Sequence, residues 1–448
     1  MVSGLRTFAL AFLLGGLSAV AAGAEPAHGV APLNSDLGQL TLRQAEIFFA
    51  ARNREVLLGQ RLVEGAEADR IAAGQRPNPN VFFNASQLGN TYPPGYDANG
   101  FTRRADMTVG VNQLFERGNK RELRVGAADS NVLASRGDYA DIQRQQKVVL
   151  YGAYYDLVAA QDRLRIASET AESFHKTMDA VERRLKAGDI SASDVARIRV
   201  DALRAQNDAR AAQADRQKAQ SALGYVIGVE REAARINAAD GWPDLDAAAG
   251  TPEIDKALAG RADVQAAQAR VTAAEKSRDL ARSLRTRDVT AQLQFDRTPW
   301  NPITNSTSAN TVGFGLSVPL FLNYYYEGEI RRAEVELQSA RDNYERVRAL
   351  ALGEIAKSRA DLDAARERVQ RFRESLLQAA QKAADAAEFA YSRGAIGVMD
   401  LLDARRQLYA TRLEASSTQA DYAKSLAAWQ AAIAVVEIEP KATEKMTQ

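Results

Sequence analysis

Most of the chain has the pattern of long amphipathic helices. Proline is absent from residues 95–242 and 320–439, and helix interiors exclude proline. Both segments are rich in Ala, Arg, Gln, Glu and Leu, which favour helices. Residues 120–186 could form one helix, which at 1.5 Å per residue would be about 100 Å long. Residues 330–351 have the 3-4-3-4 spacing of a coiled-coil seam. The seam consists of Ile330, Ala333, Leu337, Ala340, Tyr344, Val347 and Ala351.

Four short segments instead alternate apolar and polar residues with a period of two, although residues 81–88 do so less regularly than the other three. This pattern indicates β-strands with one apolar and one polar face. The segments span residues 81–88, 107–115, 289–297 and 311–321. They could form two hairpins on a soluble core, or belong to an outer-membrane barrel, whose strands have roughly 9–11 residues. The polar faces carry small hydrophilic residues, which suit a water-filled lumen better than a packed core.

The order of these elements occurs twice along the chain. Motifs in the first half return 206 residues later in the second half. The repeated residues are Gly188, Ile190 and Asp194, then Gly394, Ile396 and Asp400. We therefore divide the chain into a first repeat at residues 25–240 and a second at residues 241–448. Each repeat has the order helix, two strands, long helix, tip and returning helix. The tips lie at residues 186–194 and 392–400, and the second repeat ends in a C-terminal tail.

The repeated motif predicts two tight helical hairpins. Gly188 and Gly394 would end the long helices as left-handed C-caps, and Ser191 and Gly397 are candidate N-caps of the returning helices. An aspartate follows each N-cap by three residues, where its negative charge favours the helix N-terminus. Both tips are therefore expected at one end of the molecule, with the strands at the other end.

The first 24 residues have the layout of a signal peptide. A basic residue, Arg6, precedes an apolar run, which ends in the small residues Ala22, Gly23 and Ala24. This A-x-A pattern predicts cleavage after Ala24 and export of the mature chain. The alternative is a membrane anchor helix, for which the apolar run is short.

Composition excludes several classes of protein. The chain has 58 Lys and Arg against 57 Asp and Glu, so no basic excess indicates a nucleic-acid partner. The mean hydropathy of −0.33 argues against a bundle of membrane helices. Cysteine is absent, which excludes disulfides and thiolate metal sites. With two histidines and five methionines, a dedicated soft-metal site is not expected.

Four strands are too few for a closed barrel. Lipid does not tolerate open sheet edges, and even small barrels need roughly eight strands. If the strands cross a membrane, several copies of the chain must therefore combine. Three copies would supply twelve strands and would bring their tips together.

The tips and the strand-to-helix joints together resemble the TolC family of outer-membrane efflux proteins. The matching segments are 188–202, 394–412, 112–121 and 317–321, and the resemblance runs from about Leu40 to about Glu437. It implies a mainly α fold with a membrane β part, in which a homotrimer forms a twelve-stranded β-barrel. The barrel would lie in the bacterial outer membrane, and a long α-helical tunnel would reach into the periplasm. A periplasmic adaptor and an inner-membrane pump would be the partners of this passive duct.

The resemblance also implies roles for residues at the tips. Asp400 and Asp403 would line the constriction at the periplasmic mouth, although Asp400 could equally serve as a helix N-terminal acid. The residues expected to contact the adaptor are Arg184, Leu185, Gly188, Ile190, Asp194, Arg197, Arg393, Gly394, Ile396 and Arg405. Arg197 and Arg405 would either pair with acids or be solvated. Ile396 departs from the family pattern, in which a basic residue can help to lock the closed mouth.

A narrower resemblance is to the heavy-metal branch of the family, the CzcC-like ducts that serve RND pumps. It rests on residues 184–208 and 113–123. It implies export of divalent cations such as Co, Zn and Cd, with no metal cage or cofactor in the duct itself. Multidrug efflux and type I protein secretion remain alternatives.

Two other classes of protein compete with the duct. A periplasmic coiled-coil adaptor also has an export signal and helical hairpins, but usually only one hairpin and a lipoyl-like half-motif. An enzyme would need a catalytic motif. The chain contains no Ser/His/Asp set, HExxH, Walker loop or dinucleotide-binding glycine motif.

Overall fold

The structure is a computed structural model that describes residues 36–87, 105–245, 253–299, 307–436. The predicted signal peptide at residues 1–24 and most of the predicted C-terminal tail lie outside these ranges. Within the described residues, no helix combines the length and apolarity needed to cross a membrane.

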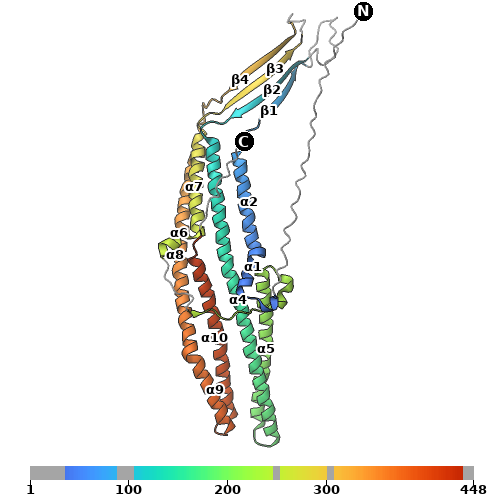
Figure 1. The fold of residues 1–448 in the computed structure, drawn as a ribbon, viewed down its shortest axis with the longest axis vertical. Coiled ribbons are helices and arrows are strands. Elements are labelled where there is room, and N and C mark those ends of the chain that lie inside the picture. The colour runs from blue at the N-terminus through green and yellow to red at the C-terminus, as the bar shows by residue number, and fades with distance from the viewer. Residues whose placement is uncertain (1–35, 88–104, 246–252, 300–306, 437–448) are drawn as a thin grey trace, which may run out of the picture. The chain divides into compact units, whose positions relative to one another are not determined.

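The chain is mostly helical with one small sheet, as predicted (Figure 1). The first half contains α1 (Leu42–Arg52), α2 (Arg54–Gly74), β1 (Asn80–Ser86), β2 (Asp106–Phe115), α4 (Lys120–Lys186) and α5 (Ala192–Val226). The second half contains α6 (Ile254–Gly260), α7 (Ala262–Ser283), β3 (Val289–Thr298), β4 (Ala309–Ser317), α8 (Glu327–Arg371), α9 (Leu377–Ser392) and α10 (Val398–Ala432). A π-helical turn, Phe372–Leu376, joins α8 to α9.

Element boundaries agree with the sequence in the helices and differ at the strand ends. The 67-residue helix α4 has the predicted bounds. The first strand was expected at 81–88, but β1 ends at Ser86 because Gln87 has a positive φ of 60° and leaves the extended conformation. The last strand was expected at 311–321, but β4 spans Ala309–Ser317. Pro319, which has no N–H to donate to a neighbouring strand, explains why it cannot continue.

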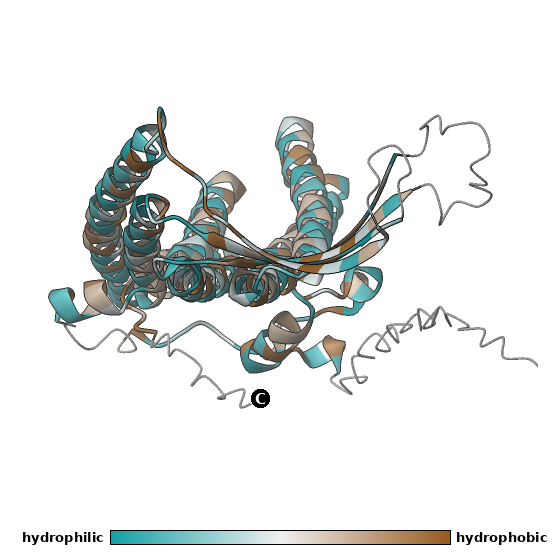
Figure 2. Cartoon of the chain, turned by 90° about the horizontal axis from the view of Figure 1, so that it is seen from above, coloured by the Kyte–Doolittle hydropathy of each residue, from teal (hydrophilic) through white to brown (hydrophobic). Residues whose placement is uncertain are grey.

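The four strands form one antiparallel sheet in the order β1-β2-β3-β4. The pairing of β2 with β3 joins the two halves, with Val111 opposite Leu293 and Val109 opposite Phe295. These residues share one face, and the face is apolar. It has no cover within the described chain, since Val81 is 74% exposed and Phe314 is 71% exposed. Figure 2 shows hydrophobic and hydrophilic residues alternating along the curved strands.

The other face of the sheet is polar except for Phe82, whose ring lies over Gly110. Gly110 lies opposite Gln294, which lies opposite Gly313. The hydroxyl of Thr108 donates to Asp296 Oδ1 at 2.6 Å, and Gln294 Nε2 donates to Asp296 Oδ2 at 2.9 Å. Small residues and a hydrogen-bonded polar row therefore occupy the face that the sequence predicts to be wet.

Helix α4 is the central element, because α2, α5, α7 and α10 all pack against it. Small residues allow the closest of these approaches. A Cβ atom at Gly137 would lie 2.7 Å from the Cβ of Ala266 and 3.0 Å from the carbonyl oxygen of Ala262, both on α7. In α8, the predicted seam is confirmed, since Ile330, Ala333, Leu337 and Ala351 are buried and the other seam residues are half-buried.

The contact at Gly137 gives a prediction with a built-in control on the same helix. Gly137→Ala is expected to destabilise the protein by about 1–3 kcal/mol, because α4 and α7 would have to move apart. At Gly152, also in α4, an added Cβ would meet no atom within 4 Å. Gly152→Ala should therefore stabilise the helix by up to about 1 kcal/mol. Thermal unfolding of both variants tests this, and shifts of the same sign and size would contradict it.

The buried guanidinium of Arg261 is the centre of a polar network that connects four helices from both halves of the chain. Arg261, whose side chain is 1% exposed, donates to Asp263 Oδ2 and to Glu354 Oε2, each at 2.7 Å. Its other terminal nitrogen donates to the carbonyl oxygen of Ala432 at 3.2 Å. Arg144 reaches Glu354 Oε1 from α4 at 3.0 Å. The network therefore spans α4, α7, α8 and the end of α10.

The network changes the pKa of its carboxyl groups. Burial alone would raise the pKa of Asp263 and of Glu354. The hydrogen bonds and charge of Arg261, with the charge of Arg144, outweigh burial and hold both pKa values below their usual range. Both groups therefore stay ionised, and their ionisation stabilises the folded chain.

Candidate functional site

The two hairpin tips are built by the same local structure. Gly188 follows α4 with a φ of +81°, and the amide of Asp189 donates to the carbonyl of Arg184 at 2.9 Å. Gly394 follows α9 with a φ of +70°, and the amide of Ala395 donates to the carbonyl of Ala390 at 2.9 Å. Both are glycine C-caps of the kind the sequence predicts. They reverse the chain into α5 and α10, and the tips lie side by side (Figure 1).

The aspartates of the repeated motif cap the returning helices. Ser191 Oγ accepts a hydrogen bond from the amide of Asp194 at 3.1 Å and donates to Asp194 Oδ2 at 2.7 Å. In the second tip, Asp400 Oδ2 accepts from the amide of Gly397 at 3.2 Å. Asp400 therefore has the helix-capping role that sequence analysis left open, and its side chain is also exposed.

Asp403 lies one turn further along α10 and is paired. Arg406 Nη1 donates to Asp403 Oδ1 at 2.7 Å. The same guanidinium contacts Asp201, a buried carboxylate on α5. Arg406 thus links the two hairpins and partly neutralises Asp403. Asp403 is a residue that the sequence predicts at the site, whereas Arg406 and Asp201 are not. The i,i+3 spacing of Arg406 from Asp403 is a local signal that could have found Arg406, but no local spacing relates Asp201 to either residue.

Apolar residues also join the two tips. Phe174, Val181, Val195, Ile198, Ala205, Val398 and Leu402 form one cluster, with Ile190 packed against it. Ile396 is half-buried and Leu185 is 38% exposed. The hairpins therefore form one packed unit that leaves polar and charged side chains at its surface.

The remaining predicted tip residues have different surroundings. Arg184 Nη1 donates to the hydroxyl of Tyr391 at 3.0 Å, which joins the first tip to α9. Arg393 lies over the ring of Phe389, 5.3 Å from its centroid. Arg197 is exposed. All three arginines are exposed at the tips, as is Phe389.

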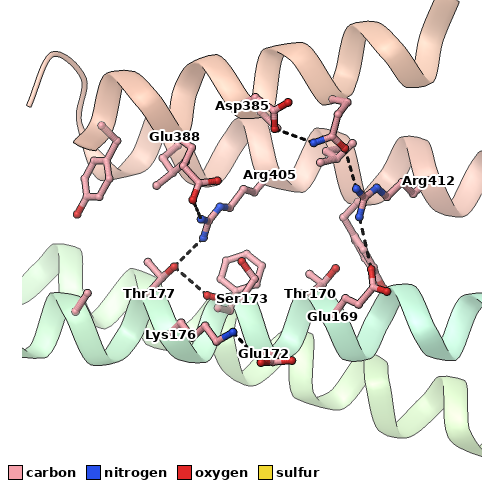
Figure 3. A pocket seen from close by; sticks show the side chains of 18 of the residues that line it. Glu169, Thr170, Glu172, Ser173, Lys176, Thr177, Asp385, Glu388, Arg405 and Arg412 are labelled. Atoms are coloured by element: carbon pink, nitrogen blue, oxygen red, sulfur yellow. Dashed lines mark hydrogen bonds and ion pairs between the residues drawn. The ribbon is translucent and has the colours of Figure 1, made fainter. Parts of the chain in front are cut away.

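A groove of about 630 Å³ separates the hairpins above the tips (Figure 3). Arg405 projects into it from α10, pairs with Glu388 at 3.3 Å and donates to Thr177 Oγ1 at 2.8 Å. Arg412, two turns further along, donates to Gln381 Oε1 at 2.8 Å and lies 3.7 Å from Glu169 Oε2. Arg405 is therefore a paired residue that clasps α10 to α4.

Metal ligands do not gather in the part of the chain that the structure describes. There, no group of three or more His, Cys, Asp or Glu side chains is arranged so that it could hold a metal ion.

Comparison with known proteins gives a family and a fold. A sequence model of the family described as outer membrane efflux protein matches residues 49–229 and 254–435. The cobalt-zinc-cadmium resistance protein CzcC of Cupriavidus metallidurans is 24% identical over 379 residues, which are 84% of this chain and 85% of that protein.

Two solved structures have the same fold. The structure of CusC, studied for folding and transmembrane channel formation, superposes with a TM-score of 0.75 at 18% identity, over 88% of this chain and 92% of CusC. The outer membrane protein VceC of Vibrio cholerae gives a TM-score of 0.70 at 20% identity, over 88% and 95% of the two chains.

Proposed function

The chain belongs to the outer membrane efflux protein family, and from that premise we propose that it is the exit duct of a tripartite efflux system. In this proposal the duct passively conducts substrate that a periplasmic adaptor and an inner-membrane pump deliver to it. The family consists of channel proteins rather than enzymes, so specificity would lie in the pump and the duct would supply the path through the outer membrane.

The observation that carries the proposal is the two-faced sheet. One face is apolar and exposed, with Val81, Phe83, Val312 and Phe314 each more than 60% exposed. The other face carries glycine, threonine, glutamine and Asp296, with Phe82 as its one aromatic residue in the described strands. Lipid on one side and water on the other satisfy these two faces at once. A soluble core would satisfy them only if it covered the apolar face, and that face is exposed in the described chain.

The unpaired edges of the sheet support a trimer. β1 and β4 lie at the two edges of the four-stranded sheet, and a membrane structure cannot leave their backbone groups without partners. Pairing β4 of one copy with β1 of the next would close the sheet. Three copies would give a twelve-stranded barrel, wide enough for water.

The tips would then form the periplasmic mouth and the adaptor contact. In a trimer, Asp400 and Asp403 of the three copies would converge on the axis as six carboxylates, an arrangement that attracts cations. Arg184, Arg197 and Arg393 would remain at the outside of the mouth, available to an adaptor. Arg405 and Arg406 would hold the hairpins together. In this way they would keep the mouth closed, although position 396 carries isoleucine instead of a basic residue.

The similarity to CzcC supports the substrate class that we propose. CzcC is a cobalt-zinc-cadmium resistance protein, so divalent heavy-metal cations are the substrate we propose for the system that this duct serves. Multidrug efflux and protein secretion are the other pump classes for such a duct.

The proposed function predicts a selective phenotype. A strain that lacks this chain should become several-fold more sensitive to Co²⁺, Zn²⁺ and Cd²⁺, because the exit through the outer membrane is lost. Its tolerance of dyes, detergents and antibiotics should not change. Minimum inhibitory concentrations with and without a plasmid-borne copy measure this. Sensitivity to organic compounds alone would remove the metal assignment and keep the duct.

A separate measurement tests the duct itself. The chain should stay with the outer-membrane fraction after a carbonate wash, because its strands would lie in the bilayer. Release by the wash would remove the duct and favour a periplasmic protein.

A further inference from the structure

The four connections between helices and strands meet in one place, which we call the joint region. It consists of residues 75–79, 284–288, 318–326 and 112–124, the last of which also includes the end of β2 and the first turn of α4. Side chains of one connection contact the backbone of another. Gln113 Nε2 donates to the carbonyl of Pro77 at 2.9 Å, Lys120 Nζ to that of Thr286 at 2.8 Å, and Arg285 Nε to that of Tyr325 at 3.2 Å. The connections therefore form one continuous surface at the end of the sheet.

Positive charge is concentrated in the joint region. It contains seven Lys and Arg residues and three Asp and Glu residues. The net charge of the joint region is therefore +4, whereas the net charge of the whole chain is +1. The rest of the protein is therefore slightly acidic, and the basic surface is local.

Two of the three acids in this region form ion pairs with basic residues of the same region. Asp288 Oδ1 accepts from Lys120 Nζ at 2.7 Å. Glu116 binds Arg124 through both carboxylate oxygens, at 2.8 and 3.1 Å. The hydrogen bonds from Arg124 lower the pKa of Glu116, which keeps this pair ionised. The third acid, Glu122, is exposed and lies 4.0 Å from Arg121.

Four arginines remain with no carboxylate partner in the described part of the chain: Arg76, Arg117, Arg285 and Arg287. All four are exposed. Arg285 uses only Nε for the carbonyl of Tyr325, so its terminal nitrogens remain available. Arg287 lies over the ring of Phe321, 5.4 Å from the centroid. Each guanidinium therefore presents donors to the surroundings.

The arginines adjoin the apolar face of the sheet. Phe115 lies opposite Val289 at the last register position between β2 and β3. Arg117 follows Phe115 by two residues and Arg287 precedes Val289 by two, so both lie just beyond this end of the sheet. The joint region also contains exposed apolar side chains. These are Phe115 (54% exposed), Leu320 (71%), Leu322 (76%), Tyr324 (50%) and Tyr325 (47%).

A groove in the joint region combines both kinds of surface. It has a volume of about 600 Å³, and its walls include the cations Arg76, Lys120 and Arg121, the carboxylates Glu116 and Glu122, and the apolar Leu114 and Phe115. Because the cations outnumber the carboxylates, the groove favours a ligand that is anionic at one end and apolar at the other. An inorganic anion would satisfy only the arginines, and a neutral lipid only the apolar walls.

We propose that the joint region binds the headgroups of anionic phospholipids of the phosphatidylglycerol class, in the membrane leaflet that faces the helices. This rests on the proposed function, because it requires the strands to span the outer membrane. Guanidinium groups match phosphate oxygens with paired donors, and basic residues next to a membrane attract anionic lipid. Aromatic side chains favour the same interfacial depth. The bound lipids fix the height of the strands in the bilayer.

The test uses the full chain, purified as the assembled protein in detergent. Phosphatidylglycerol or phosphatidylcholine is added, and the thermal unfolding midpoint and the lipids retained in native mass spectrometry are measured. Phosphatidylglycerol should raise the midpoint more than phosphatidylcholine and should stay bound. Replacing Arg76, Arg117, Arg285 and Arg287 together by Gln should remove this preference, since each arginine contributes about fivefold to affinity for an anionic surface.

Two further variants make the result specific. Lysine at the same four positions keeps the charge and should retain most of the preference. Glutamine at four exposed arginines on helices away from the joint region, Arg204, Arg210, Arg348 and Arg373, should leave it unchanged.

Several outcomes would overturn the proposal. Equal loss of the phosphatidylglycerol preference in both glutamine sets would do so, as would full retention in the joint-region set. Inorganic phosphate that reproduces the lipid effect at matched ionic strength would show a free-anion site instead. Channel conductance in phosphatidylcholine bilayers separates this test from the proposed function. If the joint-region variant conducts ions but has no lipid preference, the proposed lipid site and the proposed duct function are both supported. If the wild type does not conduct, the proposed duct function is wrong.

Discussion

Arg261→Met is expected to lower the free energy of unfolding by about 3 kcal/mol, the lower end of the range for breaking a buried ion pair. The side chain of Arg261 is 1% exposed, and its loss leaves the carbonyl of Ala432 without this donor and Asp263 with only the amide of Val264. Glu354 is 46% exposed and keeps Arg144, so it can regain water, which limits the cost. The shift of the thermal unfolding midpoint of the detergent-solubilised protein measures the effect.

The destabilisation should depend on pH. The folded-state pKa values of Asp263 and Glu354 are lowered, so their contribution is fully present above the unfolded-state pKa values. It is lost as the pH falls through the lowered folded-state values. The difference between wild type and Arg261→Met should therefore be largest near neutral pH and shrink in acid.

An exposed ion pair provides the control for that comparison. Arg199 pairs with Glu182 at 3.1 Å, and both side chains are largely exposed. Arg199→Met should change the stability by less than about 1 kcal/mol. Equal effects of the two substitutions, or an Arg261→Met effect that does not change with pH, would show that the buried network has no special role.

The second large effect is expected at the mouth of the proposed duct. Replacing Asp400 and Asp403 by Asn should raise the La³⁺ concentration that blocks single channels in planar bilayers by at least about tenfold. Six converging carboxylates attract a trivalent cation, and their loss removes several kcal/mol of Coulomb attraction. Asn keeps a side-chain oxygen for the helix cap at Gly397, so the hairpin should remain folded.

Asp194 provides the matched control. It occupies the same position in the first tip and caps α5 through Ser191, but it is not expected at the aperture. Asp194→Asn should leave the La³⁺ block unchanged. If the double variant is blocked as readily as the wild type, Asp400 and Asp403 do not line the constriction.

Local signals explain why so much of the helical framework could be predicted. The bounds of α4, the glycine C-caps at Gly188 and Gly394, and the N-cap at Ser191 each depend on residues within one helical turn. The alternation of the strands is equally local. The register of β2 with β3 is not local, yet the apolar face of each strand already identified which side chains would lie together.

Contacts between distant residues could not be predicted in the same way. Arg406 contacts Asp201 across 205 positions, and Arg405 contacts Thr177 across 228. Many arginines and acids in the chain have similar local surroundings, so only the packed hairpins select the pairs. The π-helical turn at Phe372–Leu376 contains neither Gly nor Pro. Its sequence therefore resembles that of the helices on either side.

The two open edges of the sheet have a genetic consequence. Each copy in the proposed trimer would complete the strand pairing of both neighbours. A chain with a defective β1 or β4 would therefore leave a neighbouring copy without its pairing strand, and the barrel would not close. In a cell that makes normal and defective chains in equal amounts, only about one trimer in eight would contain normal chains alone. Edge-strand mutations should therefore be dominant, whereas a mutation that prevents the chain from folding at all should be recessive.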